Sequence, residues 1–115
     1  MPHLSSAIRT GSLLFLSGQL AFDDKGQISG DIEAQTALTL EHQFAVLAQH
    51  GLSPENVVKA GVWLTERANF QRFDQAFARA FGAHRPTRST VISQLALEGA
   101  LVEIDLIASF EPLDP

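Results

Sequence analysis

The sequence predicts an α+β domain in which two helices cover one face of a mixed β-sheet. Three observations predict this fold class. The chain has 115 residues, a length that suits one domain with one hydrophobic core. Several segments have apolar residues at every second position, which is typical of strands, and two have the period of amphipathic helices. The order is strand, strand, helix, strand, helix, strand, strand without a repeat or linker, so we expect a single domain over residues 1–115.

The first two strands are expected at residues 5–9 and 12–20, around the turn sequence Thr-Gly-Ser. The second strand has leucines on one face and residues such as Phe15 and Ser17 on the other. The segment after it, residues 22–31, is rich in Asp, Gly and Ser, which favour turns. We therefore expect two consecutive strands and then a segment of turns before the first helix.

Two amphipathic helices are expected in the middle of the chain. The first follows Asp31, a suitable N-cap, and ends at Gly51. Its apolar stripe recurs at intervals of four and three residues: Ile32, Thr36, Leu40, Phe44 and Leu47. The second helix is expected to be capped by Asn69 and to end before Gly82, with a stripe of Phe70, Phe73, Phe77 and Phe81. A phenylalanine stripe at helical spacing is far more often core than ligand site, so we interpret it as core.

Three further strands are expected at residues 56–66, 88–93 and 100–110. One face of the first carries Val58, Ala60, Val62 and Leu64. In the last strand one face is wholly apolar, whereas the other carries Glu103 and Asp105 between two apolar residues. Two carboxylates in the middle of such a strand need an explanation beyond packing.

Apolar side chains also occur on strand faces that two helices on one side leave uncovered. These are Leu13, Phe15, Leu101 and Ile107. Contiguous exposed apolar area of this kind usually marks an interface. We therefore expect a homo-oligomer that buries this face, with Glu103 and Asp105 near the interface between subunits.

The composition disfavours several classes of partner and site. Eight Lys and Arg residues against 13 Asp and Glu residues give a net charge of −5, which argues against nucleic acid and anionic membranes as partners. The chain has no cysteine, and its longest apolar run near the start, residues 13–16, is too short for a signal peptide, so we expect a cytoplasmic protein. The histidines lack metal-site spacing and the glycines lack a phosphate-binding pattern, so we expect no metal and no cofactor.

A carboxylate near an apolar interface needs a partner, because an isolated buried charge is costly to desolvate. Arg88 begins a neighbouring strand and shares one face of it with Thr90 and Ile92. In one interpretation Arg88 forms a structural ion pair with Glu103 or Asp105. In the other, Arg88 binds the carboxylate of a small substrate and Glu103 acts on its reacting end. The residue pattern alone leaves both open.

Four segments together resemble the Rid family, the RidA/YjgF-type reactive intermediate deaminases. They are LFLSGQLAFDDKGQISGDIEAQT, VVKAGVWLTERANF, RPTRSTV and GALVEIDLIA, and the resemblance extends from Ala7 to Ala108. It implies a chorismate-mutase-like fold and a homotrimer with clefts between subunits. It also implies hydrolysis of enamine and imine intermediates, such as 2-aminoacrylate, to 2-keto acids and ammonia without a metal or cofactor.

The resemblance also implies roles for three residues. Arg88 matches the arginine that binds the substrate carboxylate, and Glu103 matches the glutamate thought to position and activate the attacking water. Ser17 matches the serine of the SGQ element that lines the cleft. This mechanism leads us to expect the Arg88 guanidinium at a crevice between subunits, without a protein carboxylate as its partner.

Three positions depart from the family pattern and are expected to line the substrate cleft. Leu4 stands where many relatives have the tyrosine of a GPY element, Asp74 where relatives often have Asn, and Thr90 where Cys is frequent. These changes predict an altered substrate or a feeble deaminase, and Arg85 is expected to be a solvated loop residue. The alternative function is non-catalytic binding of small carboxylates or keto acids, or a regulatory role, on the same trimeric fold. A nuclease role, suggested for some relatives, is disfavoured by the acidic balance.

Overall fold

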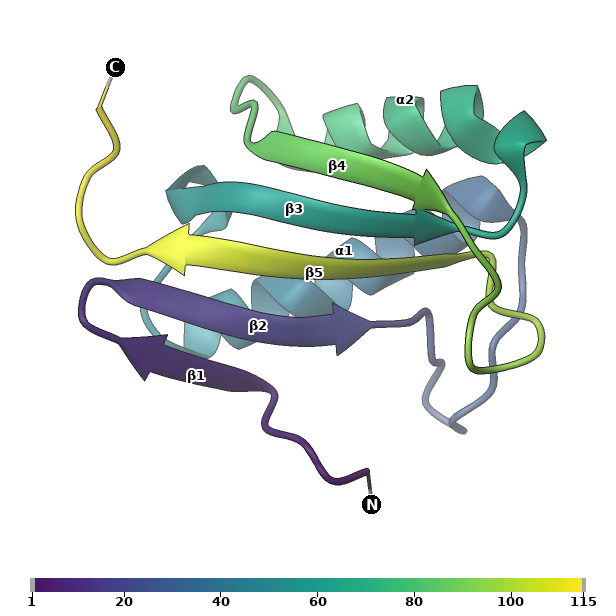
Figure 1. The fold of residues 1–115 in the computed structure, drawn as a ribbon, viewed down its shortest axis with the longest axis horizontal. Coiled ribbons are helices and arrows are strands. Elements are labelled where there is room, and N and C mark those ends of the chain that lie inside the picture. The colour runs from purple at the N-terminus through teal and green to yellow at the C-terminus, as the bar shows by residue number, and fades with distance from the viewer. Residues whose placement is uncertain (1, 115) are drawn as a thin grey trace.

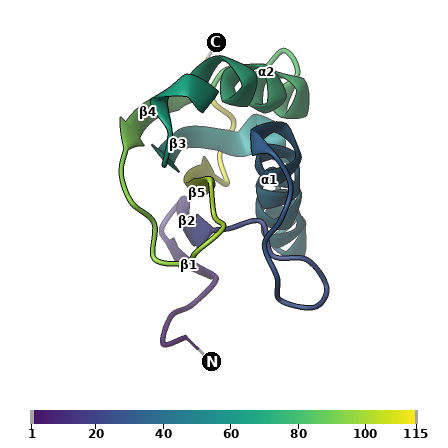
Figure 2. The ribbon, with the colours of Figure 1, turned by 90° about the vertical axis from the view of Figure 1, so that its right-hand side faces the viewer.

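The computed structural model describes residues 2–114 and contains a five-stranded sheet with the strand order β1-β2-β5-β3-β4. The strands are β1 (Ala7–Thr10), β2 (Leu13–Gln19), β3 (Val57–Leu64), β4 (Thr87–Ile92) and β5 (Val102–Ser109). The helices are α1 (Ile32–Gln49) and α2 (Phe70–Phe81). The pair β3 and β4 is parallel and the other neighbouring pairs are antiparallel. Figure 1 shows the sheet and Figure 2 shows both helices on one side of it, which confirms the predicted fold class.

Helix α1 begins as predicted, because the Asp31 side chain accepts a hydrogen bond from the Ala34 amide at 2.9 Å. Polar residues at helical spacing are buried beside its apolar stripe: Gln35, Thr39 and Gln43. The apolar period does not predict these residues. Gln35 donates to the Gly99 carbonyl and accepts from the Leu101 amide, so it connects α1 to the start of β5. No helix within residues 2–114 is long and apolar enough to cross a membrane.

The phenylalanine stripe of α2 is core, with one exception. Phe70, in the first turn, is 40% exposed, whereas the other three phenylalanines are buried. Asn69 occupies the N-cap position of α2, as predicted, but its backbone angles are helical, at the end of a 3-10 turn, Arg67–Asn69, and its side chain makes no capping hydrogen bond. Such a bond requires a non-helical backbone at the N-cap residue. Gly82 ends the helix with a φ of 67°, a conformation that favours glycine.

Strand β3 pairs irregularly with β5, because the register shifts between Val57 and Lys59. Val57 is buried and Val58 is only half-buried, so the alternation predicted from Val58 onward does not hold at the start of the strand. The predicted residues after the shift are buried: Ala60, Val62 and Leu64. An extra residue in a strand moves its neighbours to the other face, and alternation alone does not reveal where this happens. Strand β1 begins at Ala7, two residues later than predicted.

The register determines which strand residues face the helices. Leu106 of β5 lies beside Ala60 of β3, which lies beside Arg88 of β4. Leu106 and Ala60 are buried in the core, so Arg88 lies on the helix-covered face. Glu103 lies beside Trp63 and belongs to the opposite face, which neither α1 nor α2 covers. We call this second face the open face.

The open face carries a row of apolar side chains across three strands, formed by Ile8, Phe15 and Ile107. We call it the apolar row. Phe15 is 42% exposed, Ile8 is more exposed still, and Ile107 is half-buried. The predicted surplus of apolar side chains is therefore present on the face that the helices leave uncovered.

Candidate functional site

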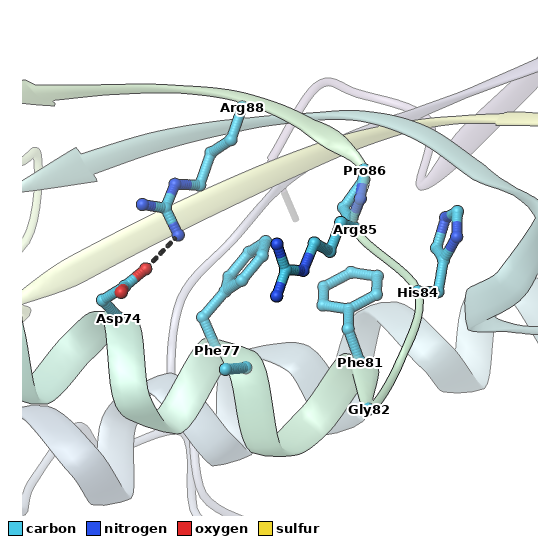
Figure 3. A pocket seen from close by; sticks show the side chains of 9 residues that line it. Asp74, Phe77, Phe81, Gly82, His84, Arg85, Pro86 and Arg88 are labelled. Carbon is cyan, nitrogen blue, oxygen red and sulfur yellow. Dashed lines mark hydrogen bonds and ion pairs between the residues drawn. The ribbon is translucent and has the colours of Figure 1, made fainter.

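Arg88 extends from the edge strand β4 toward α2, as Figure 3 shows. Its Nη1 donates a hydrogen bond to Oδ1 of Asp74 at 2.8 Å. Its guanidinium carbon lies 4.9 Å from the ring centroid of Phe77 and 5.2 Å from that of Phe73. Aromatic faces attract cations at such distances. The guanidinium is thus held between a carboxylate and an aromatic surface, while 21% of the side chain stays exposed.

These contacts correct both interpretations of Arg88. The guanidinium does have a protein partner, Asp74, and the alternative partners Glu103 and Asp105 lie on the open face. The pair is accessible to ligands, because the Asp74 side chain is 51% exposed and the Arg88 Nη2 and Nε have no protein acceptor within residues 2–114. An exposed ion pair contributes roughly 0–1 kcal/mol. A ligand carboxylate can therefore compete with Asp74 or bind the remaining N–H groups.

A cavity of about 560 Å³ lies beside Arg88, between α2 and the loop that leads into β4. Its charged lining residues include Asp74 and Arg85, and Phe77 and Phe81 contribute apolar walls. Figure 3 shows Arg85 with Phe77 and Phe81 among the side chains that line the cavity. Arg85 is exposed, as expected of a solvated residue, but its position on the cavity wall is not predicted by the sequence. Two guanidinium groups on the wall suit a ligand that carries a carboxylate group.

Glu103 lies half-buried on the open face of β5, against Gly18 of the SGQ element. A Cβ atom at position 18 would lie 2.5 Å from Oε2 of Glu103, so any other residue there would displace the carboxylate. Burial raises the pKa of Glu103, and the nearby charge of Asp105 raises it further. The carboxylate accepts no hydrogen bond from residues 2–114. A carboxylate in this state is suited to take up and release a proton.

Asp105 shares the open face with Glu103 but is bonded to the backbone. Its Oδ1 accepts a hydrogen bond from the Gly61 amide at 3.0 Å. Burial raises the pKa of Asp105, while this hydrogen bond and the charge of Lys59 act in the opposite direction. No group of three metal-ligating side chains within residues 2–114 is close enough to hold a metal ion. Of the two half-buried carboxylates, Asp105 therefore has a hydrogen bond to the backbone, whereas Glu103 has none within residues 2–114.

The backbone beside Glu103 is held by Gln43, a residue that the sequence analysis missed. Strand β2 has an irregular register between Leu16 and Gln19. Nε2 of Gln43 donates to the carbonyls of Ser17 and Ile104, at 2.9 and 2.7 Å, across this irregularity. The Ser17 hydroxyl is also occupied, because it donates to the Ser5 carbonyl at 2.5 Å. A signal was present in the sequence, since Gln35, Thr39 and Gln43 follow one another at intervals of four residues.

The residues predicted to line one cleft fall into separate places in a single chain. Asp74 and Thr90 accompany Arg88 on the helix-covered side, Thr90 by the alternation of β4. Ser17 accompanies Glu103 near the irregularity in β2. Leu4 precedes β1 and is 63% exposed. One copy of the chain therefore does not bring Arg88 and Glu103 to a common ligand.

Comparison with known proteins agrees with the resemblance of the sequence segments. Residues 1–110 match the endoribonuclease L-PSP family. A RutC family protein of Pyrococcus horikoshii is 37% identical over 90% of this chain and 84% of that protein. A Yersinia pestis protein of unknown function from the conserved Rid protein family has a TM-score of 0.89 and 35% identity, over 95% of this chain and 89% of that chain.

Escherichia coli TdcF is named as a candidate reactive intermediate deaminase. It is 31% identical over 85% of this chain and 79% of that protein. Its crystal structure with bound serine has a TM-score of 0.88 and 28% identity, over 95% of this chain and 89% of that chain. The chain therefore belongs to the endoribonuclease L-PSP family, the family of the Rid and YjgF proteins.

Proposed function

We propose that this protein hydrolyses reactive enamine and imine intermediates of the 2-aminoacrylate type to 2-keto acids and ammonia. Family membership supports this class of reaction, since the relative TdcF is named as a candidate reactive intermediate deaminase. The observation that carries the proposal is that the chain supplies two groups of complementary chemistry. Arg88 is a partly exposed guanidinium beside a cavity, and Glu103 is a carboxylate whose pKa burial raises. The first suits a substrate carboxylate and the second suits proton transfer.

The proposed site is shared between two copies of the chain, because Arg88 and Glu103 lie on opposite faces of one sheet. Arg88 is on the edge strand β4, whereas Glu103 is on the central strand β5. If the open face of one copy packs against β4 and α2 of the next, both groups reach one ligand and the apolar row is buried. Cyclic closure makes all such sites equivalent, and the family resemblance suggests three copies, a homotrimer.

In the proposed reaction the substrate carboxylate binds Arg88, and ionised Glu103 takes a proton from water as the water oxygen bonds to the protonated imine carbon. Glu103 then donates this proton to the nitrogen. When the C–N bond breaks, the hydroxyl proton passes back through Glu103 to the departing ammonia, and the carbonyl of the keto acid forms. The other residues proposed to line the cleft are Leu4, Ser17, Asp74 and Thr90. The proposed steps use no metal or cofactor.

The proposal is tested with a pyridoxal-phosphate enzyme that generates 2-aminoacrylate, while disappearance of the imine is followed. The protein is expected to accelerate hydrolysis, and Arg88→Ala is expected to remove the acceleration. Arg79→Ala is the matched control. Arg79 is an arginine of α2, the helix that Arg88 contacts, but it does not line the cavity. An Arg88→Ala protein that assembles normally and keeps the full rate would exclude the mechanism.

A binding protein without catalysis is the second candidate function. It is favoured by the separation of Arg88 from Glu103, since a chain that does not assemble can bind a carboxylate without hydrolysing an imine. Calorimetry with 2-ketobutyrate, beside the turnover assay, distinguishes the two functions. Binding that depends on Arg88 without any imine turnover supports the second function and contradicts the first.

A further inference from the structure

We propose that Asp74 makes the Arg88 pocket selective for ligands that carry both a carboxylate and a protonated nitrogen. Ligands with the same carbon skeleton but a carboxylate alone are expected to bind less well. This inference rests on the proposed function and deepens it, because it names the charge state of the substrate that the site accepts.

Repulsion is the first half of the argument. A carboxylate that binds Arg88 comes close to the Asp74 carboxylate, which is itself 2.8 Å from Nη1 of Arg88. Two negative charges on one guanidinium repel each other. Arg88 cannot easily turn away from Asp74 to relieve this repulsion, because its guanidinium carbon lies 4.9 Å from the Phe77 ring and 5.2 Å from the Phe73 ring.

Attraction is the second half. The Asp74 side chain is 51% exposed, and its Oδ2 has no hydrogen-bond partner within residues 2–114. An α-imino or α-amino acid carries its nitrogen one carbon away from its carboxylate. A ligand whose carboxylate is on Arg88 can therefore place its N–H groups on Asp74, so that each protein charge faces a ligand charge of opposite sign. A keto acid has only a carbonyl oxygen at that position, and two acceptors then face each other.

The other charged side chain on the cavity wall does not provide this selectivity. Arg85 attracts the carboxylate of any ligand and repels a protonated nitrogen, so it cannot favour the nitrogen. Nε2 of His84, on the same wall, is 2.7 Å from the Val57 carbonyl, and an imidazole carries no negative charge with which to favour a protonated nitrogen. Among the described residues that line the cavity, Asp74 is the carboxylate. Discrimination by the charge on nitrogen therefore falls to Asp74.

Selectivity of this kind distinguishes the substrate of the proposed reaction from its product. A protonated imino acid has no net charge, whereas the keto acid that it becomes has one negative charge. Asp74 is therefore expected to favour entry of the imino acid and departure of the keto acid. Removing the charge of Asp74 should increase inhibition by the product.

The test measures binding of L-alanine and pyruvate, which share a three-carbon skeleton, to the assembled protein by calorimetry. In Asp74→Asn the ratio of alanine affinity to pyruvate affinity is expected to fall on the order of tenfold relative to wild type. Asparagine keeps the size of the side chain and can still accept a hydrogen bond from Arg88. Pyruvate is also expected to inhibit imine hydrolysis more strongly in this variant.

Two further variants serve as controls. Glu33→Gln removes one carboxylate of similar exposure, 42% against 51% for Asp74, from a pair with Arg72 away from the cavity. Its affinity ratio is expected to match that of wild type. Asp74→Glu retains the charge and is expected to retain most of the selectivity. If Asp74→Asn does not fold, the proposal is still tested by two measurements: wild type must bind alanine more tightly than pyruvate, and Asp74→Glu must retain most of that preference.

The outcomes separate this inference from the proposed function. If Arg88→Ala loses both ligands while Asp74→Asn keeps the wild-type ratio, the role of Asp74 is wrong and the carboxylate site stands. Wild-type protein that binds pyruvate but shows no alanine binding also overturns the role of Asp74. If Arg88→Ala binds both ligands as tightly as wild type, the site itself is wrong and the proposed function fails with it.

Discussion

At the scale of single residues, Glu103 and Asp105 are two similar carboxylates whose different surroundings suit them to different roles. Both lie on the open face, and burial raises the pKa of each. Asp105 accepts a hydrogen bond from the Gly61 amide, whereas Glu103 lies against Gly18 without such a bond. Asp105 therefore contributes to the pairing of β5 with β3, whereas the Glu103 oxygens have no hydrogen-bond donor within residues 2–114.

Replacing Glu103 tests this division. Glu103→Gln is expected to lower the rate of imine hydrolysis roughly 10²–10⁴-fold, because the amide cannot take up a proton, while keto acid binding at Arg88 persists. Burial and Asp105 raise the pKa of Glu103, and the base must be ionised, so the wild-type rate should rise with pH through a range above the ordinary value of 4.5. A pH–rate profile measures this. A variant with the wild-type profile would show that another group is the base.

The sequence identifies the chemical residues better than their partners. Arg88, Asp74 and Glu103 can be named from their motifs, and alternation places Arg88 and Thr90 on one face. The ion pair between Arg88 and Asp74 cannot be predicted in this way, because it depends on how α2 lies across β4. The position of Arg85 on the cavity wall depends on the path of a loop, which no periodic pattern describes.

At the scale of secondary structure elements, Gln43 connects α1 to two strands at the place where β2 departs from regular pairing. Its amide nitrogen donates hydrogen bonds to the carbonyls of Ser17 and Ile104. These two residues adjoin Gly18 and Glu103, which are in contact. Buried carbonyl groups need a donor, and the irregular register removes the regular one. Gln43 therefore stabilises the local backbone that positions the carboxylate.

Gln43→Leu is expected to destabilise the fold, because leucine removes the donor to one buried and one half-buried carbonyl group. Each such group costs about 1–3 kcal/mol, and urea unfolding at neutral pH measures the sum. Gln49→Leu is a suitable control, since Gln49 is exposed at the end of α1 and should change stability by less than about 0.5 kcal/mol. Equal stability of the Gln43 variant and wild type would mean that the carbonyls find other donors.

Periodicity predicts the elements well and their irregularities poorly. The bounds of α1 follow from Asp31, the apolar stripe and Gly51, and the structure agrees with them. Asn69 lacks a capping bond and Val58 is only half-buried because a 3-10 turn and a register shift interrupt the regular backbone. Each interruption involves only a few residues, so it barely changes the spacing of the apolar residues along the chain.

At the scale of the whole molecule, the fold class follows from the sequence because both helical stripes need one apolar sheet face to cover. The same argument predicts that Phe15 and Ile107 of the apolar row are left uncovered, whereas Ile8 joins them through the pairing of β1 with β2. The registers of β3 with β5 and with β4 are what the sequence does not reveal, and together they place Arg88 and Glu103 on opposite faces of the sheet. The sequence therefore predicts an oligomer, whereas only the strand pairing shows that one copy does not bring Arg88 and Glu103 to a common ligand.

Mixed assemblies test the shared site directly. Arg88→Ala chains and Glu103→Gln chains, each inactive alone, are expected to regain about a quarter of wild-type activity after unfolding and refolding together at equal amounts. That share follows because one cleft in four would combine an intact Arg88 from one chain with an intact Glu103 from the next. The activity of the mixture, compared with each variant refolded alone, measures it. Mixed assemblies without activity would show that the two groups do not act across an interface.

The placement of Arg88 and Glu103 on opposite faces has a consequence for how much protein a cell must make. Under the proposed mechanism a solitary chain carries only half of each site and would turn over nothing, so turnover per chain would rise with the concentration of chains until assembly is complete. Below that concentration, doubling synthesis would more than double the rate of imine hydrolysis.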